Sequence, residues 1–458
     1  MAATITNDFK RFILRKIFAD FSDNTNRFYI GIGKADQWDD ADNPPTYTGT
    51  IAEMRRAKAA MQSVKAAADV SFVVKRNNWS SGTKYDAWDD ALIGEGTNPF
   101  YVITDENNVY LCMRESRSAD GTHNNSTVKP THITATRPET MSDGYKWKYM
   151  FSLRPADTSA FLSANFIPVR KSGGAESGLG AQQDAVQAAS TRGQITGVQL
   201  YDGGAGYGSA PTVTIEGDGD SATATAFVTG GVVTHIHIDS STDSGMKFGH
   251  GYNYAGIKLT GGSPTRAARA RAVIGDVYGE GIGNDPRNDL KSTALMFNTK
   301  PNGTESGAFF TGGQDFRQVS LMTDIIDSSG GDLTASAYKA IQFIDTDNAT
   351  EAGGFALDTV ITGQTSGSKA LFVANSGTKI YFTQNDSTGF GNFDSENISG
   401  TASGGGTQNA TLIDGIKRYE AVFPPGDSDK GHILYIDNRA AVVRDNAQTE
   451  DLKVVIQI

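Results

Sequence analysis

The sequence is poor in the residues on which disulfide-rich and metal-dependent proteins are built. It has one cysteine and six histidines among 458 residues. A single cysteine excludes an internal disulfide framework. Cys112 lies in the apolar run Val109-Tyr-Leu-Cys-Met113, which is typical of a small buried side chain rather than of a nucleophile. We therefore expect a protein that folds in a reducing cytoplasm.

Long apolar runs and an excess of basic residues are also missing. No stretch approaches the roughly 20 apolar residues that span a bilayer. Lys10, Arg11, Arg15 and Lys16 interrupt the apolar residues of the first 21 positions, which argues against a secretory signal. The formal net charge is −11. Because binding to nucleic acid or to an anionic membrane relies on clustered Lys and Arg, we expect neither as the main partner.

Glycine, by contrast, is abundant and indicates strands joined by turns. The chain has 52 glycines against 13 prolines, with 38% hydrophobic and 20% charged residues. This composition is typical of soluble folded proteins, and it favours strands over helical bundles. The length suggests roughly three units of about 150 residues each, and one core with insertions is equally allowed. The sequence predicts an all-β or a β-rich α+β protein.

Two helices are predicted near the N-terminus, and strands follow. Thr6 or Asn7 caps the first helix, whose apolar residues recur at helical spacing up to Phe21. The second helix begins at Thr50, where Thr50 and Glu53 have capping-box spacing, and extends to about Ala68. Strands are predicted at residues 28–32, 70–75, 109–114, 145–153, 292–298, 316–323, 433–436, 441–444 and 452–458, with a turn at Asp437-Asn438. The tail from Gly431 to Ile458 is predicted to form a strand pair that closes the core.

One predicted strand has an unusually aromatic face. Tyr145, Trp147, Tyr149 and Phe151 alternate, so they are predicted to lie on the same side of a sheet. Such a stripe can stack on sugars or bases, but aromatic side chains bury large areas, so core packing is the preferred interpretation.

An internal repeat with a period of about forty residues occupies 193–275. The segment 193–200, the turn Gly204-Ala-Gly-Tyr207 and the segment 222–226 recur as 231–238, Gly249-His-Gly-Tyr252 and 268–272, with extra residues around Asp243. Neither copy alone buries much surface, so 193–275 is predicted to form one small inserted β domain. A weaker repeat pairs 355–371 with 393–412.

These patterns predict a core that is interrupted twice. The predicted segments are the N-terminal part of the core (1–170), a linker or short helix (171–192), the first inserted repeat domain (193–275), the middle part of the core (276–350), the second inserted repeat region (351–415) and the C-terminal strands of the core (416–458).

Three motifs resemble ligand sites, and none has the required pattern. Gly363-Gln-Thr-Ser-Gly-Ser-Lys369 lacks the spacing of a phosphate loop and lies between strands. Gly203-Gly-Ala-Gly-Tyr-Gly208 has no following helix, so it is not a dinucleotide fingerprint. Asp345, Asp347 and Glu351 depart from a calcium-binding EF-hand at Thr350 and Ala356, which leaves only an irregular calcium site open.

His235 and His237 alternate on a predicted strand and so point to the same side, as half of a metal site would. Their counterparts in the first copy of the repeat are Gly197 and Gln199, so they occupy the outward register of an amphipathic strand. No nucleophile elbow or zinc-binding helix is present. We therefore assign no catalytic, cofactor-binding or metal-binding residue, and we expect a protein without enzymatic activity or cofactor.

Five segments carry a family resemblance when they are taken together and in order. They are Phe28-Tyr-Ile-Gly-Ile-Gly-Lys-Ala-Asp-Gln-Trp38 with Pro44-Pro45, Arg76-Asn-Asn-Trp79 leading to Tyr85, Asp143-Gly-Tyr-Lys-Trp-Lys-Tyr-Met-Phe151, Phe316-Arg-Gln-Val-Ser-Leu-Met-Thr323, and the tail 432–458 with Tyr435-Ile-Asp-Asn-Arg439 and Gln448-Thr-Glu-Asp451. The chain resembles the baseplate wedge proteins (gene product eight type) of T-even-type contractile phages over roughly 1–170, 290–345 and 416–458. Both repeat blocks fall outside these ranges.

The resemblance implies a layered β-sandwich with N-terminal helices, a homodimer, and assembly with other wedge proteins in the baseplate of the virion, after folding in the host cytoplasm. Two alternatives stay open. The first alternative is a tail-associated adhesin, whose Gly-rich repeats and exposed aromatic residues would bind surface glycans. The second is a polysaccharide depolymerase, since Gly-rich β repeats occur in such enzymes too.

Overall fold

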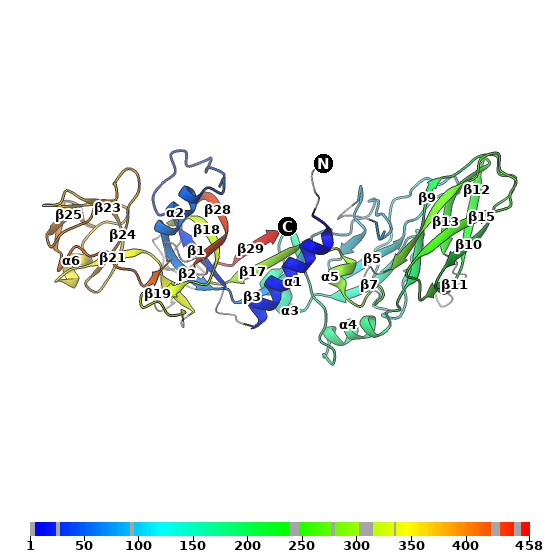
Figure 1. The fold of residues 1–458 in the computed structure, drawn as a ribbon, viewed down its shortest axis with the longest axis horizontal. Coiled ribbons are helices and arrows are strands. Elements are labelled where there is room, and N and C mark those ends of the chain that lie inside the picture. The colour runs from blue at the N-terminus through cyan, green and yellow to red at the C-terminus, as the bar shows by residue number, and fades with distance from the viewer. Residues whose placement is uncertain are drawn as a thin grey trace. The chain divides into compact units, whose positions relative to one another are not determined.

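A computed structural model describes residues 5–23, 28–91, 96–238, 247–275, 280–301, 315–333, 336–422, 431–443 and 450–458. It consists mainly of antiparallel sheets with a few short helices (Figure 1), which confirms the predicted β-rich α+β class. The chain forms two compact units. Unit 1 comprises Met1–Leu14, Ser71–Leu295 and Gln457–Ile458, and unit 2 comprises Arg15–Val70 and Met296–Ile456. The first predicted insertion therefore lies in unit 1, and the second insertion lies in unit 2.

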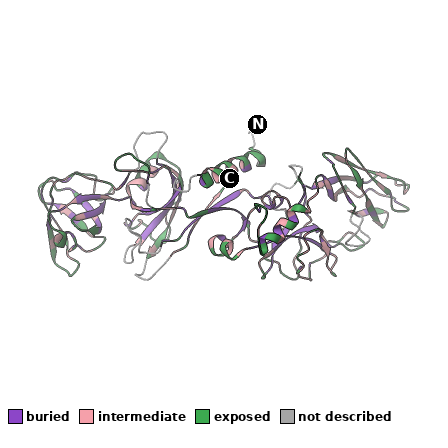
Figure 2. Cartoon of the chain, turned by 90° about the horizontal axis from the view of Figure 1, so that it is seen from below, coloured by how far each residue is buried: buried purple, intermediate pink, exposed green. Residues whose placement is uncertain are grey.

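A five-stranded sheet organises unit 2. Its order is β20-β2-β1-β18-β28. All six residues of the central strand β1 are buried, and β18 is buried over almost its whole length (Figure 2), because each of these strands has a neighbour on both sides. The strands are β1 (Phe28–Gly33), β2 (Met61–Ala66), β18 (Asp315–Thr323), β20 (Ala337–Lys339) and β28 (His432–Val443).

The two predicted N-terminal helices are present, but the second is shorter than predicted. Helix α1 (Asn7–Asp23) buries Phe21 against Phe28 and Phe297, with ring centroids 5.9 and 6.0 Å away. Helix α2 (Ile51–Ala59) has the predicted capping box of Thr50 and Glu53. The prediction that this helix extends to Ala68 is wrong, because β2 begins immediately after it. Pairing of β2 with β1 outweighs the helix propensity of the Ala-rich segment.

The C-terminal tail differs from its prediction in two ways. Strand β28 is continuous from His432 to Val443, so the predicted turn at Asp437-Asn438 is wrong. Both residues stay in the ladder, opposite Val319 and Gln318, and the Gln318 side chain donates a 2.7 Å hydrogen bond to Asn438 Oδ1. Strands β28 and β29 (Leu452–Gln457) belong to different sheets, so the tail does not form a strand pair. The neighbour of β29 is β17 (Ala294–Thr299).

The second insertion of unit 2 forms a six-stranded sheet of its own in the order β21-β24-β23-β22-β25-β26. The two predicted repeat strands, β22 and β25, lie side by side, with Thr362 opposite Ser399. The elements are β21 (Gln342–Asp345), α6 (Ala349–Ala352), β22 (Val360–Gly363), β23 (Lys369–Ser376), β24 (Lys379–Thr383), β25 (Asn397–Thr401) and β26 (Thr407–Thr411); the short pair β19 (Ile326–Asp327) and β27 (Ala421–Val422) is separate.

Unit 1 contains a four-stranded sheet in the order β4-β5-β7-β6, in which one aromatic residue departs from its predicted face. Tyr145, Trp147 and Tyr149 pack in one core cluster, but Phe151 belongs to another cluster together with Met150. The register shift between Val109 and Tyr110 leaves one extra residue in β7, and such a bulge moves the next side chain to the other face.

The remaining elements of this part of unit 1 are short. They are β3 (Asp69–Lys75), β4 (Tyr101–Ile103), β5 (Asn108–Arg114), β6 (Glu139–Thr140), β7 (Lys146–Ser152), α3 (Pro155–Phe161), β8 (Phe166–Val169), α4 (Leu179–Ala188) and α5 (Pro286–Asp289). Helix α4 occupies the segment that the sequence predicted as a linker or short helix, and its Val186 is fully buried beside the aromatic cluster.

The first insertion is a six-stranded sheet in which the two repeat copies exchange strands. The order is β13-β12-β10-β15-β16-β9, so the first strand of each copy pairs with the last strand of the other copy. At its centre Val213 lies opposite Leu259, and Ile215 lies opposite Ile257. The strands are β9 (Gln194–Asp202), β10 (Thr212–Gly217), β12 (Ala224–Thr229), β13 (Val232–Ile238), β15 (Ala255–Thr260) and β16 (Arg269–Gly275), with β11 (Asp220–Ala222) and β14 (Phe248–His250) as a separate pair.

The Gly-Tyr turns of the repeat explain why two copies are needed. The backbone N–H of Tyr207 donates to Gly231 O at 2.9 Å, and that of Tyr252 donates to Gly193 O at 3.2 Å. Each tyrosine is thus held by the other copy and fills one of the two apolar clusters of the domain. The repeat is therefore one cooperative domain rather than two modules. The extra residues around Asp243 lie outside the described residues.

Removal of residues 452–458 is expected to destabilise the protein strongly. Strand β29 buries Leu452 and Val454, which are 8% and 4% exposed. Losing both side chains from a core costs roughly 3–6 kcal/mol, a large share of a total stability of about 5–15 kcal/mol. Thermal unfolding of the truncated chain should occur well below that of the intact chain, whereas the exposed Gln457→Ala variant should melt normally. A truncated chain that melted like the intact protein would contradict this role of β29.

Candidate functional site

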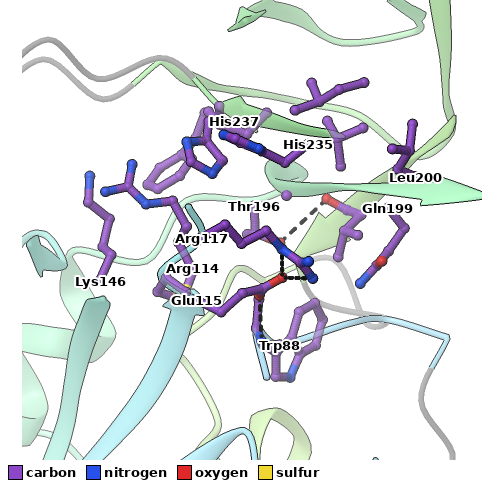
Figure 3. A pocket seen from close by; sticks show the side chains of 18 of the residues that line it. Trp88, Arg114, Glu115, Arg117, Lys146, Thr196, Gln199, Leu200, His235 and His237 are labelled. Carbon is purple, nitrogen blue, oxygen red and sulfur yellow. Dashed lines mark hydrogen bonds and ion pairs between the residues drawn. The ribbon is translucent and has the colours of Figure 1, made fainter. Parts of the chain in front are cut away.

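One cavity in the described part of the chain lies within unit 1, where the first insertion meets the β4-β5-β7-β6 sheet (Figure 3). Its volume is about 180 Å³. One wall consists of residues 196–200 of β9 and 234–238 of β13, which are the two edge strands of the inserted sheet and equivalent segments of the repeat. The opposite wall includes Met113, Arg114, Glu115 and Arg117, at and beyond the end of β5.

Several contacts hold the insertion against this part of the core. Arg271 of β16 forms ion pairs with Asp89 and Asp90, at 2.5 Å to the Asp90 carboxylate. The Thr234 hydroxyl donates to Ala119 O at 3.1 Å. Val273 belongs to the same apolar cluster as core residues of β5 and β7. The cavity is therefore a gap within a packed interface, and both of its walls are fixed.

One charged feature of the cavity is the ion pair between Arg117 and Glu115. Arg117 donates from Nε and Nη2 to Glu115 Oε1 at 3.0 and 2.8 Å, and from Nη1 to Gly121 O at 2.8 Å. The second oxygen of Glu115 accepts the backbone N–H of Ala87 at 2.9 Å. The charge of Glu115 is thus balanced by Arg117, and the pair forms a rigid rim.

Two further cations line the same cavity. Arg114 extends from the end of β5, and Lys146 extends from the start of β7 with 4% of its surface exposed. Figure 3 shows both side chains beside His237, on the far side of the cavity from Trp88. With both histidines neutral, the described lining residues carry three positive charges and one negative charge, although the chain as a whole is acidic.

His235 and His237 form an aromatic group with Phe227. The ring of Phe227 stacks on His235 with centroids 4.4 Å apart, and the two imidazoles are 4.6 Å apart. Burial, followed by the nearby Arg114 charge, lowers the pKa of His237 to about 3. Burial, followed by Arg117, also lowers the pKa of His235. Both imidazoles are therefore neutral at pH 7.

The sequence placed the two histidines correctly but not their surroundings. They point outward from the inserted domain, as the repeat alignment predicted, yet His235 is only 8% exposed because the core covers it. Arg114, Arg117 and Lys146 were not identified from the sequence. Their gathering depends on tertiary contacts, and the only local signal is Lys146, a cation within a strand of buried aromatic residues.

The other motifs singled out in the sequence have structural roles. In the turn after Gly363, where a phosphate loop would bind its ligand, the Glu396 carboxylate accepts the N–H groups of Thr365 and Ser366 at 2.5 and 3.0 Å. Asp345 forms a 3.1 Å ion pair with Arg418. Within the described ranges, no group of three or more His, Cys, Asp or Glu residues is arranged to hold a metal ion.

The remaining two candidates from the sequence also have structural explanations. Cys112 is fully buried, and burial raises the pKa of its thiol. A buried thiol with a raised pKa is unreactive. In the turn at Gly203–Gly208, the Asp202 carboxylate accepts the N–H of Gly204 at 2.9 Å, and strand β10 follows rather than a helix.

No family model matches the chain, and no curated protein matches it. In the described part of the chain, no helix is both long enough and apolar enough to cross a membrane.

Acid should destabilise the protein partly through His237. Below pH 6.5 the unfolded chain protonates this imidazole, but the native state resists protonation down to about pH 3. Stability therefore falls as the pH falls through this window, by up to about 1.4 kcal/mol per pH unit. His237→Gln, which restores the residue of the other repeat copy, should flatten urea-unfolding stability between pH 6.5 and 4. The control, His250→Gln, changes a side chain that is 61% exposed. Parallel pH profiles for His237→Gln and wild type would contradict the buried neutral imidazole.

Glu396 should stabilise the second insertion. Burial raises the pKa of this carboxyl, but hydrogen bonds from Ser366 and from backbone N–H groups outweigh it and lower the pKa to about 2. Glu396→Gln should cost about 2 kcal/mol at pH 7. The difference from wild type should vanish as the pH falls from 4.5 to 2, because the wild-type carboxyl is then protonated as well. The measurement is urea unfolding at several pH values, with the exposed Asp386→Asn as control. A pH-independent difference would refute this explanation.

Proposed function

We propose that the chain is a non-enzymatic structural component of a contractile phage tail, a baseplate wedge protein that assembles with other wedge proteins and with a second copy of itself. The proposal rests on the family resemblance of five sequence segments. What supports it is where these segments lie in the fold.

Three of the five segments are neighbouring strands of one sheet. The segments that begin at Phe28, Phe316 and His432 form β1, β18 and β28, with Ile30 opposite Leu321 and Leu321 opposite Tyr435. The loop after β1 also reaches β28, since Trp38 Nε1 donates to Arg439 O at 2.9 Å and Asn438 Nδ2 donates to Pro45 O at 2.8 Å. Residues that carry the resemblance thus contact one another, which is expected of a common framework and not of chance matches.

The other two described segments meet in unit 1. Trp79 and Tyr85 pack in the same aromatic cluster as Tyr145 and Trp147. The rings of Tyr85 and Trp147 are 5.4 Å apart, edge to face. Both repeat blocks lie outside these contacts, as insertions into a framework would. Residues 448 and 449 of the tail motif lie outside the described residues.

Strand β28 supports a role in assembly. It is twelve residues long and stands at the edge of its sheet, with one described strand partner. Leu434 and Tyr435 on it are 44% and 37% exposed. An exposed strand edge offers backbone hydrogen bonds to another chain, and exposed apolar side chains add affinity. This surface, defined by Leu434, Tyr435 and the β28 edge, is the single observation that most favours an interaction protein.

A glycan-binding adhesin is the second candidate, and one observation favours it. Tyr201 and Tyr254 of the first insertion are 64% and 66% exposed. Exposed aromatic rings stack on sugars. A glycan screen on the full chain separates the two functions, because saturable binding that Tyr201→Ala or Tyr254→Ala abolishes would favour the adhesin. A depolymerase would instead release host capsule fragments.

Charge placed on the β28 edge should prevent assembly. We expect the chain, co-expressed with the products of neighbouring tail genes, to form a complex that sediments well above the monomer. The double variant Leu434→Lys/Tyr435→Lys should lose the complex, because buried unpaired charge is costly at an interface. Leu357→Lys is the control, since Leu357 is equally exposed at 45% but lies on the second insertion. A wild-type chain that sedimented alone would refute the proposed function, and equal effects of both variants would refute the role of β28.

A further inference from the structure

A second cavity of unit 1 has two cations among its walls. Its volume is about 310 Å³. The walls come from β5 and β7 of the core sheet, from the segment before β6, from the residues between α4 and β9, and from β14. Arg137 and Lys148 are the charged residues among the described ones that line it. This cavity is therefore positive, although the chain carries a net charge of −11.

Lys148 is a buried cation on a strand of the core sheet. It is 6% exposed and lies opposite Leu111 where β7 pairs with β5. Gly283 packs closely against its stem, since a Cβ at Gly283 would lie 3.1 Å from Lys148 Cε. Burial lowers the pKa of Lys148 to about 8, and the attraction of the Asp289 carboxylate opposes this shift. The amine is therefore still mostly protonated at pH 7.

No described residue forms an ion pair with Arg137 or Lys148, and Nε of Arg137 is buried without a described hydrogen-bond partner. The two carboxylates nearby in the fold or the sequence have other contacts. Asp289 accepts the N–H of Gly283 at 2.8 Å, and Glu139 accepts the hydroxyl of Thr134. A buried charge without a close partner costs free energy. An anion in this cavity would offset that cost.

Apolar side chains and the size of the cavity restrict the anion further. Met113, Phe248 and Ile282 line it, and each is at least nine-tenths buried. Side chains that exclude water strengthen the interaction between charges. Small-molecule sites have volumes of roughly 300–1,000 Å³, and an apolar cavity of about 150 Å³ is enough for benzene. The cavity therefore suits a small acid with a carbon skeleton.

We propose that this cavity binds a small organic carboxylate. The carboxylate pairs with Lys148 and Arg137, and the carbon skeleton lies against Met113, Phe248 and Ile282. A planar guanidinium matches the two oxygens of a carboxylate, and the lysine adds a second charged donor. The site belongs to unit 1, whereas β28 belongs to unit 2, so it does not depend on the assembly function proposed above.

The test is calorimetric titration of the full chain with acetate, hexanoate and benzoate, at pH 7 and low ionic strength. Hexanoate or benzoate should bind at one site per chain, more tightly than acetate, and should raise the melting temperature. Two probes examine the charge and the skeleton separately. Benzamide has nearly the shape of benzoate without its charge, and inorganic phosphate has charge without a skeleton. Both should bind about tenfold more weakly than the best carboxylate, or less.

Two variants and a control locate the binding. Lys148→Met should weaken carboxylate binding by about tenfold or more. The free variant should nevertheless melt no lower than wild type, because an apolar side chain replaces a buried charge. Arg137→Gln should weaken binding to a similar extent. Lys258→Gln is the control, since this lysine lies on β15, is 59% exposed and is paired with Glu216.

Four results would overturn the proposal. They are the absence of saturable binding for all three carboxylates, equal binding of benzoate and benzamide, equal binding of benzoate and phosphate, and binding that Lys148→Met and Arg137→Gln both retain unchanged. Near-ultraviolet circular dichroism checks the fold of each variant. If Lys148→Met fails to fold, the result for Arg137→Gln decides.

Discussion

Pairing of strands from distant parts of the chain is the constraint on which the rest of unit 2 depends. Strands β1, β18 and β28 begin at residues 28, 315 and 432, yet they are consecutive in one sheet. Such non-local pairing costs loop entropy before it yields any contact, and the buried apolar residues of β1 and β18 offset that cost. Long insertions between these strands add little to the entropy cost, because the cost grows only slowly with loop length. A sheet framework with two inserted repeat blocks is therefore physically reasonable.

The first insertion also depends on pairing between strands that are distant in sequence. Each repeat copy gives its first strand to the other, so the sheet closes only when both copies are present. Equivalent segments of the two edge strands then lie in one wall of the cavity, and the core covers them with Arg114, Arg117 and Lys146. The two copies differ in this wall, because Gly197 and Gln199 of the first copy correspond to His235 and His237 of the second.

Local sequence patterns predicted the fold class, the capping box of Thr50 and Glu53, and most strands. They failed where tertiary pairing decides the structure. Residues 61–66 follow a helical pattern but pair with β1, and Asp437-Asn438 has turn chemistry but stays in the ladder beside β18. The bulge that turns Phe151 to the other face leaves no trace in the alternation of residues 145–151. The candidate cavity was not predictable for the same reason, since its cations come from β5, β7 and the segment after β5, and its histidines come from β13. The assembly function rests on the resemblance of short segments, whose contacts in the fold support it.

Hydrogen exchange along β28 tests the central claim, that the framework strands serve assembly, most directly. The backbone N–H groups of residues 432–443 that point away from β18 should exchange quickly in the isolated chain, because they lie at a sheet edge. After the chain is combined with the products of neighbouring tail genes, the account predicts strong protection of these amides, with little change in the exposed strands β10 and β15 of the first insertion. Unchanged exchange along β28 in a complex that has formed, or protection confined to the first insertion, would contradict it.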